Sequence, residues 1–73
     1  MDDLDIHRAA WFRCSLRYLD HGLAERKALW ASWSKFCDVN GVEHGSKTKL
    51  YAWLLDIGAR KHGKLLRRVK LLG

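Results

Sequence analysis

The sequence predicts a small, mainly α-helical domain made of three helices followed by a short C-terminal β-hairpin. The chain has 73 residues, which is enough for one domain over residues 1–73 and leaves no room for a second. It contains no proline, so its helices can run without interruption and glycines are expected to mark their ends. Apolar residues recur at helical spacing as far as residue 58, and a basic tail follows.

Two helices are expected in the first part of the chain. The first covers residues 2–19, because aspartates at its start complement the helix dipole and an apolar stripe follows at three- and four-residue spacing. The stripe comprises Leu4, Ala9, Phe12, Leu16 and Leu19. Gly22 is expected to end this helix, and Asn40-Gly41 to end a second helix over residues 23–39. The apolar face of the second helix comprises Leu29, Trp33, Phe36 and Cys37, with Trp30 beside it. These aromatic residues are expected to pack in the core rather than to stack on bases.

A third helix is expected over residues 47–58, with Ser46 as its N-cap and Gly58 at its end. Its buried face comprises Leu50, Trp53, Leu54 and Ile57. A reciprocal capping box would have Glu or Gln where this chain has Lys49. Lys47 and Lys49 in the first turn oppose the helix dipole, at a cost of about a few tenths of a kcal/mol. Basic residues in that position indicate contact with an anion.

The tail, residues 59–72, fits two structures. Val69-Lys70-Leu71 alternates as an edge strand does, and His62-Gly63 can form the tip of a β-hairpin, which is the favoured interpretation. Leu65, Val69 and Leu72 would also fit a fourth helix. With the hairpin, the order of elements is that of a winged helix-turn-helix.

Charge is divided unequally along the chain. Residues 1–46 hold six Lys or Arg against seven Asp or Glu, whereas residues 47–73 hold eight against Asp56 alone. The second part therefore concentrates a positive field on a small surface, for which phosphate backbones and anionic membranes are the usual partners. A merely solvated basic face is the simpler alternative.

No enzymatic activity, cofactor or metal is expected. His7, His21, His44 and His62 do not combine with the cysteines in any zinc-ligand spacing, and no glycine loop has an NTPase signature. Cys14 and Cys37 stand beside apolar residues and are expected to be buried, inert thiols. The acidic start and the absence of a long apolar run predict a cytoplasmic protein without a membrane partner (host-cell cytoplasm if the protein is viral).

Double-stranded DNA is the expected partner. The third helix would enter the major groove, with Thr48, Lys49, Tyr51 and Ala52 as candidates for contact with base edges. The remaining basic residues would bind phosphate or reach the minor groove. They are Lys47, Arg60, Lys61, Lys64, Arg67, Arg68 and Lys70.

Residues 29–71 resemble the C-terminal winged-helix segment of phage and plasmid primase-helicases of the satellite-phage type. The resemblance rests on Trp33-Ser34-Lys35-Phe36-Cys37, Asn40-Gly41, Ser46, Leu54 with Ile57-Gly58, Gly63 and Val69-Lys70-Leu71. It implies a DNA-binding, origin-recognising module for DNA replication that follows a helicase core, and the chain is then either an excised domain or a free-standing relative. Because one small module should bind DNA weakly alone, self-association or tethering to a helicase or primase core is expected. This chain departs from the family in its wing, which has one glycine and no aromatic residue, and no Walker motif precedes it.

Two other functions remain open. The apolar first helix could dock a partner protein, and Trp11 or Trp30 exposed on the surface would favour that function. The segment KLLRRVKLL could also lie on an anionic membrane as an amphipathic helix.

Overall fold

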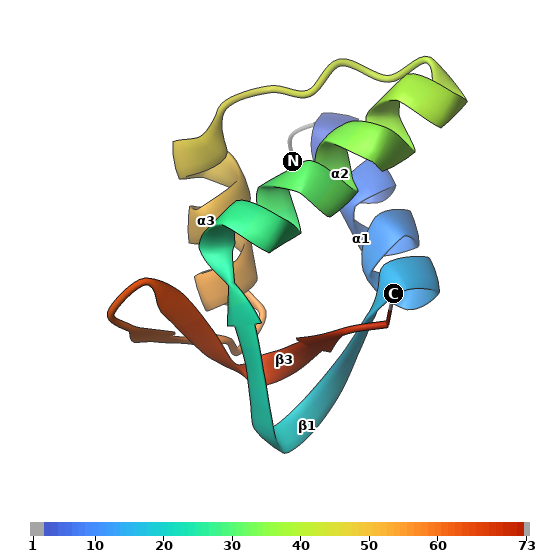
Figure 1. Cartoon of the computed structure of the whole chain (residues 1–73). Helices are drawn as coiled ribbons and strands as arrows, with labels where there is room; N and C mark the ends of the chain where they lie inside the picture. The colour runs from blue at the N-terminus through green and yellow to red at the C-terminus, as the bar shows by residue number, and fades with distance from the viewer. Residues whose placement is uncertain (1–2, 73) are drawn as a thin grey trace.

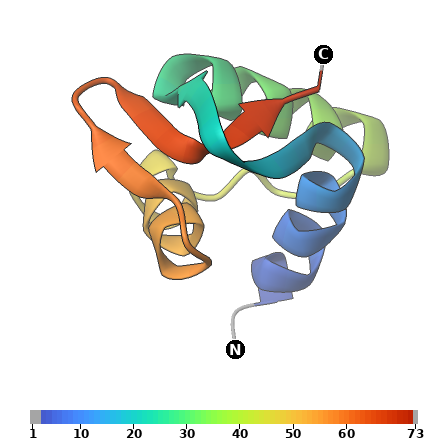
Figure 2. The same ribbon diagram turned by 90° about the horizontal axis from the view of Figure 1, so that it is seen from below.

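The computed structural model describes residues 3–72, and over this range the chain forms three helices and a three-stranded antiparallel sheet (Figure 1). In chain order the elements are α1 (Asp3–Ser15), β1 (Leu16–Glu25), α2 (Arg26–Asn40), α3 (Lys47–Asp56), β2 (Arg60–His62) and β3 (Leu65–Leu71). The helices stand on one side of the sheet, in which β3 lies between β1 and β2 (Figure 2). The result is a small α/β domain with three helices, as predicted, and with more sheet than predicted.

Strand β1 is the element that the sequence did not predict. The expected first helix ends at Ser15 instead of residue 19, and the expected second helix begins at Arg26 instead of residue 23. The segment between them pairs with β3 in antiparallel register, from Leu16 opposite Leu71 to Glu25 opposite Leu65. Its backbone partners therefore come from the other end of the chain, and no local pattern can reveal them.

Gly22 has a different role from the helix end that was predicted. It lies inside β1, where the pairing register shifts between Tyr18 and Leu23 and the strand bends sharply (Figure 1). A Cβ at this position would lie 2.9 Å from the backbone carbonyl carbon of Val69 on β3. Glycine is required here because the two backbones approach each other so closely.

The tail forms the predicted hairpin, and the alternative of a fourth helix is wrong. Strands β2 and β3 pair from Arg60 opposite Arg67 to His62 opposite Leu65, and Gly63 takes a left-handed φ of 59° in the turn. The amphipathic helix suggested for membrane binding is likewise absent, because its segment is β3. No helix between residues 3 and 72 is long and apolar enough to cross a bilayer.

The core lies between the helices and the sheet. The predicted apolar faces of the second and third helices turn toward the core: Leu29, Trp33 and Cys37 are fully buried on α2, as are Leu50 and Leu54 on α3. The other predicted members, Phe36, Trp53 and Ile57, are partly buried against this core, and Ile57 follows the end of α3 at Asp56. The remaining buried apolar residues come from α1, the strands and the segment before β2. They are Trp11, Leu16, Ala24, Ala59, Leu66 and Val69.

The apolar stripe predicted for the first helix is wrong in detail. Among residues 4–15 of α1 the buried side chains are Arg8 and Trp11, while Leu19 falls in β1 and is 42% exposed. Trp11 packs edge-on against Trp33, with ring centroids 5.6 Å apart, and its Nε1 donates a hydrogen bond to Ser32 Oγ. The side of α1 that turns inward is thus set by its packing against α2. It leaves the Cys14 thiol exposed, so the predicted burial holds for Cys37 and fails for Cys14.

A short loop, residues 41–46, connects α2 to α3 and determines where α3 begins. Gly41 takes the left-handed conformation that was expected at the end of α2, with a φ of 66°. The Trp33 indole then donates a hydrogen bond of 2.7 Å to the carbonyl of His44, which fixes the middle of the loop on α2. Ser46 is the N-cap of α3, as predicted, and its hydroxyl accepts a hydrogen bond of 3.1 Å from the Lys49 amide.

Candidate nucleic-acid interface

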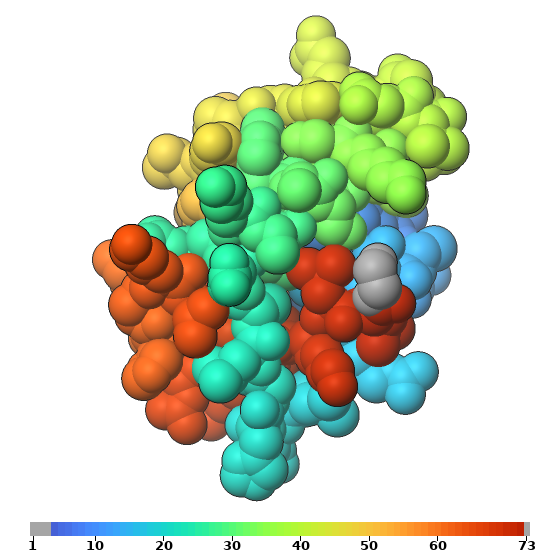
Figure 3. Space-filling model, in the orientation of Figure 1, coloured from blue at the N-terminus to red at the C-terminus, as the bar shows by residue number. Residues whose placement is uncertain are grey.

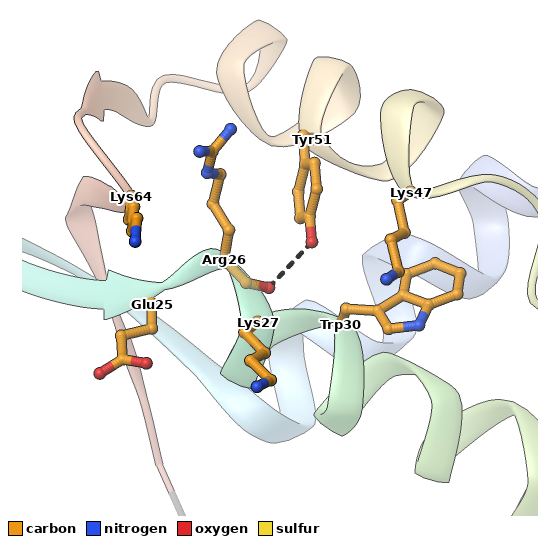
Figure 4. Close-up of a pocket in the computed structure, with 7 residues that line it drawn as sticks. All are labelled: Glu25, Arg26, Lys27, Trp30, Lys47, Tyr51 and Lys64. Atoms are coloured by element: carbon orange, nitrogen blue, oxygen red, sulfur yellow. Dashed lines mark hydrogen bonds between the residues drawn. The ribbon is translucent and has the colours of Figure 1, made fainter.

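A groove of about 550 Å³ opens where the start of α2, the start of α3 and the hairpin turn meet (Figure 4). It is lined by Glu25, Arg26, Lys27, Trp30, Lys47, Tyr51 and Lys64. Four of these residues carry positive charge and one carries negative charge. The groove therefore presents a net positive field drawn from three separate segments of the chain.

Arg26 ties these three segments together. The Tyr51 hydroxyl on α3 donates a hydrogen bond of 3.0 Å to the Arg26 carbonyl (Figure 4). The Arg26 amide donates one of 3.2 Å to the carbonyl of Lys64 in the hairpin turn. The Arg26 guanidinium also lies 5.8 Å from the centroid of the Tyr51 ring, within cation–π range. Burial raises the pKa of Tyr51, with Arg26 opposing the shift, so the hydroxyl stays protonated at neutral pH and can donate the hydrogen bond to the Arg26 carbonyl.

Trp30 lines the groove on the side away from Lys64 (Figure 4). Its indole is only partly buried, unlike that of Trp33 in the core, and the Lys47 ammonium lies 5.7 Å from the ring centroid. The His44 ring meets the indole edge-on at 6.1 Å. The prediction that the aromatic residues of the second helix are all core residues thus holds for Trp33 and only in part for Trp30.

A second hollow, of about 310 Å³, continues from this groove between α3 and the hairpin. Predicted site residues Thr48, Tyr51, Ala52 and Lys61 line it together with Arg26, Leu55 and Leu66. Lys61 reaches this side because it pairs with Leu66, whose side chain points toward the helices. The structure therefore brings much of the predicted site together on one side of α3.

Lys49 lies on the other side of α3. It lines a hollow of about 380 Å³ that faces α1, where Asp5, Asp56 and Trp53 are its neighbours. Arg8 also lines this hollow and is paired with Asp5 at 2.7 Å, so two cations and two carboxylates balance there and the potential is less positive than in the groove around Arg26. Of the predicted base contacts, Ala52 alone borders both this hollow and the one toward the hairpin.

The other basic residues of the hairpin point away from the groove. Arg60 and Arg67 are cross-strand partners, and Arg67 lines a hollow with His21 and His62 on the sheet face that is turned from the helices. Lys70 pairs with Arg17 of β1, and Arg68 is exposed with a left-handed φ of 70°. This second basic surface is separate from the groove around Arg26.

Arg26 and Lys27 are groove residues that sequence reasoning missed. Both fall in residues 1–46, where six basic residues stand against seven acidic ones, and so they were not expected to contact DNA. In the space-filling view the start of α2 lies against the hairpin (Figure 3). Arg26 and Lys27 therefore stand beside the strongly basic part of the chain, although they belong to the part with slightly more acidic than basic residues. The signal was present, because the first turn of α2, like that of α3, holds basic residues and no acidic one.

Within residues 3–72 no three His, Cys, Asp or Glu side chains stand close enough to hold a metal ion. Comparisons with protein-family models, with curated proteins and with solved structures found no match to this chain. The geometry of the groove and of α3 is therefore the basis for any statement about function.

Proposed function

We propose that this domain is a winged helix-turn-helix that binds double-stranded DNA. One observation carries the proposal: basic side chains from α2, α3 and the hairpin surround a single groove that contains only one acidic residue. Neutralising phosphates with such side chains supplies most of the affinity of small DNA-binding domains. The order of α2, a short loop, a capped α3 and a hairpin supports this fold.

In the proposed complex α3 lies in the major groove. Its exposed Thr48 and Ala52 are small enough to let the helix approach base edges closely, and either can contact a thymine methyl group. Lys47, Arg26 and Lys64 bind the backbone on one side of α3. Lys49 is exposed on the opposite side of α3, from which it contacts a guanine. Tyr51, whose hydroxyl is bonded to α2, acts mainly by holding α3 in place.

The outer surface of the hairpin gives the second set of phosphate contacts. Arg60, Arg67, Arg68 and Lys70 are all exposed, so DNA that follows the hairpin can meet several of them. A module of this size binds weakly alone. We therefore propose that it acts as a dimer or beside a helicase or primase core, in the replication of a mobile element.

The alternative is a protein-docking module that uses α1. Ile6, which is 65% exposed, supports it. Trp11, the strongest anchor that α1 could have offered, is fully buried, and so we rank this function second.

The test is a binding titration with a short duplex at several salt concentrations. If about five phosphates are contacted, the logarithm of the association constant should fall against the logarithm of salt with a slope of about −4 to −5. A slope near zero, or no binding at low salt, would contradict the proposal.

A further inference from the structure

Two aromatic side chains line the basic groove, and contact with a DNA backbone does not require their rings. Phosphates need only the cations, which Arg26, Lys27, Lys47 and Lys64 supply. Trp30 and Tyr51 nevertheless line the same groove with part of their rings accessible. An aromatic surface beside cations is the arrangement with which proteins hold an unstacked nucleobase and its phosphate.

The dimensions and the rigidity of the groove fit such a ligand. Its volume of about 550 Å³ lies within the range of pockets that enclose small organic molecules and exceeds what one phosphate requires. The Tyr51 ring is held by its hydrogen bond to the Arg26 carbonyl, and the Trp30 ring by the edge of His44. Both aromatic walls therefore have contacts that orient them when no ligand is bound.

We propose that this groove binds an unpaired nucleobase together with its phosphate. The base packs against the Trp30 indole, and the phosphate is bound by Arg26 and Lys64, whose backbones are joined by a hydrogen bond and whose side chains both line the groove. Figure 4 shows these residues around the groove. Lys47, whose ammonium covers the indole at 5.7 Å, is exposed and flexible, and it moves aside to contact the same phosphate.

This inference rests on the proposed DNA-binding function and narrows its substrate. A fully paired duplex offers this groove only phosphates, because the faces of its bases are stacked on one another and only the base edges are accessible. DNA with an extruded base, or with a single strand beside a duplex, offers both parts of the ligand. The domain should therefore prefer DNA in which a base is unpaired near the segment bound by α3.

The experiment compares a short, fully paired duplex with the same duplex carrying one unpaired adenine, by fluorescence anisotropy. The wild-type chain should bind the second about tenfold more tightly, as expected for one stacked base. Trp30→Leu should remove this preference, so that the two DNAs are bound with equal affinity. Phe36→Leu is the matched control, because Phe36 is also a partly buried aromatic residue of α2 but stacks on Trp33 away from the groove, and it should keep the preference. Trp30→Phe should keep it as well.

Equal wild-type affinity for the two DNAs, or a preference that survives in Trp30→Leu, would overturn the inference. If the paired duplex and the duplex with an unpaired adenine are bound equally well, this inference alone fails. If neither DNA is bound, the proposed function fails as well. A 2-aminopurine in place of the unpaired adenine gives a readout that needs no variant, since stacking on Trp30 should quench its fluorescence. An unchanged signal on saturation would count against the site.

The ligand could be a nucleotide within a DNA strand or a free nucleotide, and competition with free dAMP distinguishes the two. If the groove takes a nucleotide only as part of a DNA strand, millimolar dAMP should leave the complex with the unpaired adenine intact. If dAMP displaces that DNA from the wild-type chain but not from Trp30→Leu, the site is still supported and binds free nucleotides as well.

Discussion

The hydroxyl of Tyr51 donates a hydrogen bond to the backbone carbonyl of Arg26 and thereby joins the middle of α3 to the first residue of α2. The amide of Arg26 is in turn bonded to the carbonyl of Lys64 in the hairpin turn. One residue therefore connects the three segments that form the basic groove. The position of α3 relative to the hairpin depends on these two bonds as well as on the core beneath them.

Replacing Tyr51 by phenylalanine should test this connection. The variant keeps the ring and loses the hydrogen bond, so the free energy of unfolding should fall by about 1 kcal/mol. Tyr18→Phe is the control, because the Tyr18 hydroxyl lies against Gly58 at the surface and its loss should cost less. Urea unfolding followed by fluorescence measures both. Equal losses in the two variants would show that the bond to Arg26 does not stabilise the fold.

The stability of the domain should decline at alkaline pH. Burial raises the pKa of Tyr51 and of Tyr18, and it raises the pKa of the Cys37 thiol with help from the Asp38 carboxylate and against the effect of Arg8. The folded chain thus holds these protons more tightly than the unfolded chain, which releases them near the ordinary values of 9.0 for cysteine and 10.0 for tyrosine. The associated stability is complete below pH 9 and is lost as the pH rises further.

Urea unfolding between neutral pH and about pH 11 measures this decline. Tyr51→Phe and Cys37→Ala should each make it shallower, because each removes one group with a raised pKa. The same steepness in both variants and in the wild type would contradict the assignment.

Gly45→Ala should be more costly than Gly41→Ala. Both glycines have a left-handed φ, 68° and 66°, so either substitution strains the backbone by about 1–2 kcal/mol. A Cβ on Gly45 would also lie 2.9 Å from Leu4 Cδ1 and 3.5 Å from Nη2 of the buried Arg8, whereas a Cβ on Gly41 would meet nothing within 4 Å. Thermal unfolding of the two variants measures the difference. If the Gly45 variant were as stable as the Gly41 variant, the side chains of Leu4 and Arg8 on α1 would be able to move away from the new Cβ at little cost in free energy.

Lys64→Ala should reduce the salt dependence of DNA binding, because Lys64 lies in the groove beside Arg26. Losing one phosphate contact should weaken binding to all sequences alike and lower the magnitude of the log–log slope by about one unit. Lys35→Ala is the control, since Lys35 lies on α2 in a different hollow, beside Asn40 and Val39. An unchanged slope in Lys64→Ala, or an equal change in Lys35→Ala, would contradict the assignment of the groove to the DNA-binding surface.

The features that the sequence predicted correctly are the local ones. The cap at Ser46, the left-handed Gly41, the apolar faces of α2 and α3 and the hairpin tip at Gly63 each depend on neighbouring residues. Strand β1 was missed because its Leu, Ala and Arg residues suit a helix equally well, and Leu16 and Leu19 continue a helical spacing. Its pairing with β3 joins the two ends of the chain.

The candidate site divides in the same way. Lys47, Tyr51 and Lys64 were expected in it because they belong to the basic part of the chain, and they do line one groove. Arg26 was missed because its relevance comes from α2 beginning next to the hairpin turn, which depends on β1. Lys49 was placed among the base contacts on residue type, although the helix carries it round to the side of Asp5 and Asp56.

The most direct test of DNA binding through α3 and the groove is an NMR titration of the ¹⁵N-labelled chain with a short duplex. The account predicts amide shifts in Lys47–Asp56, in the turn of the hairpin around Lys64 and at Arg26 and Lys27, with little change in α1. Shifts centred on α1, or none at a DNA concentration well above that of the protein, would contradict it.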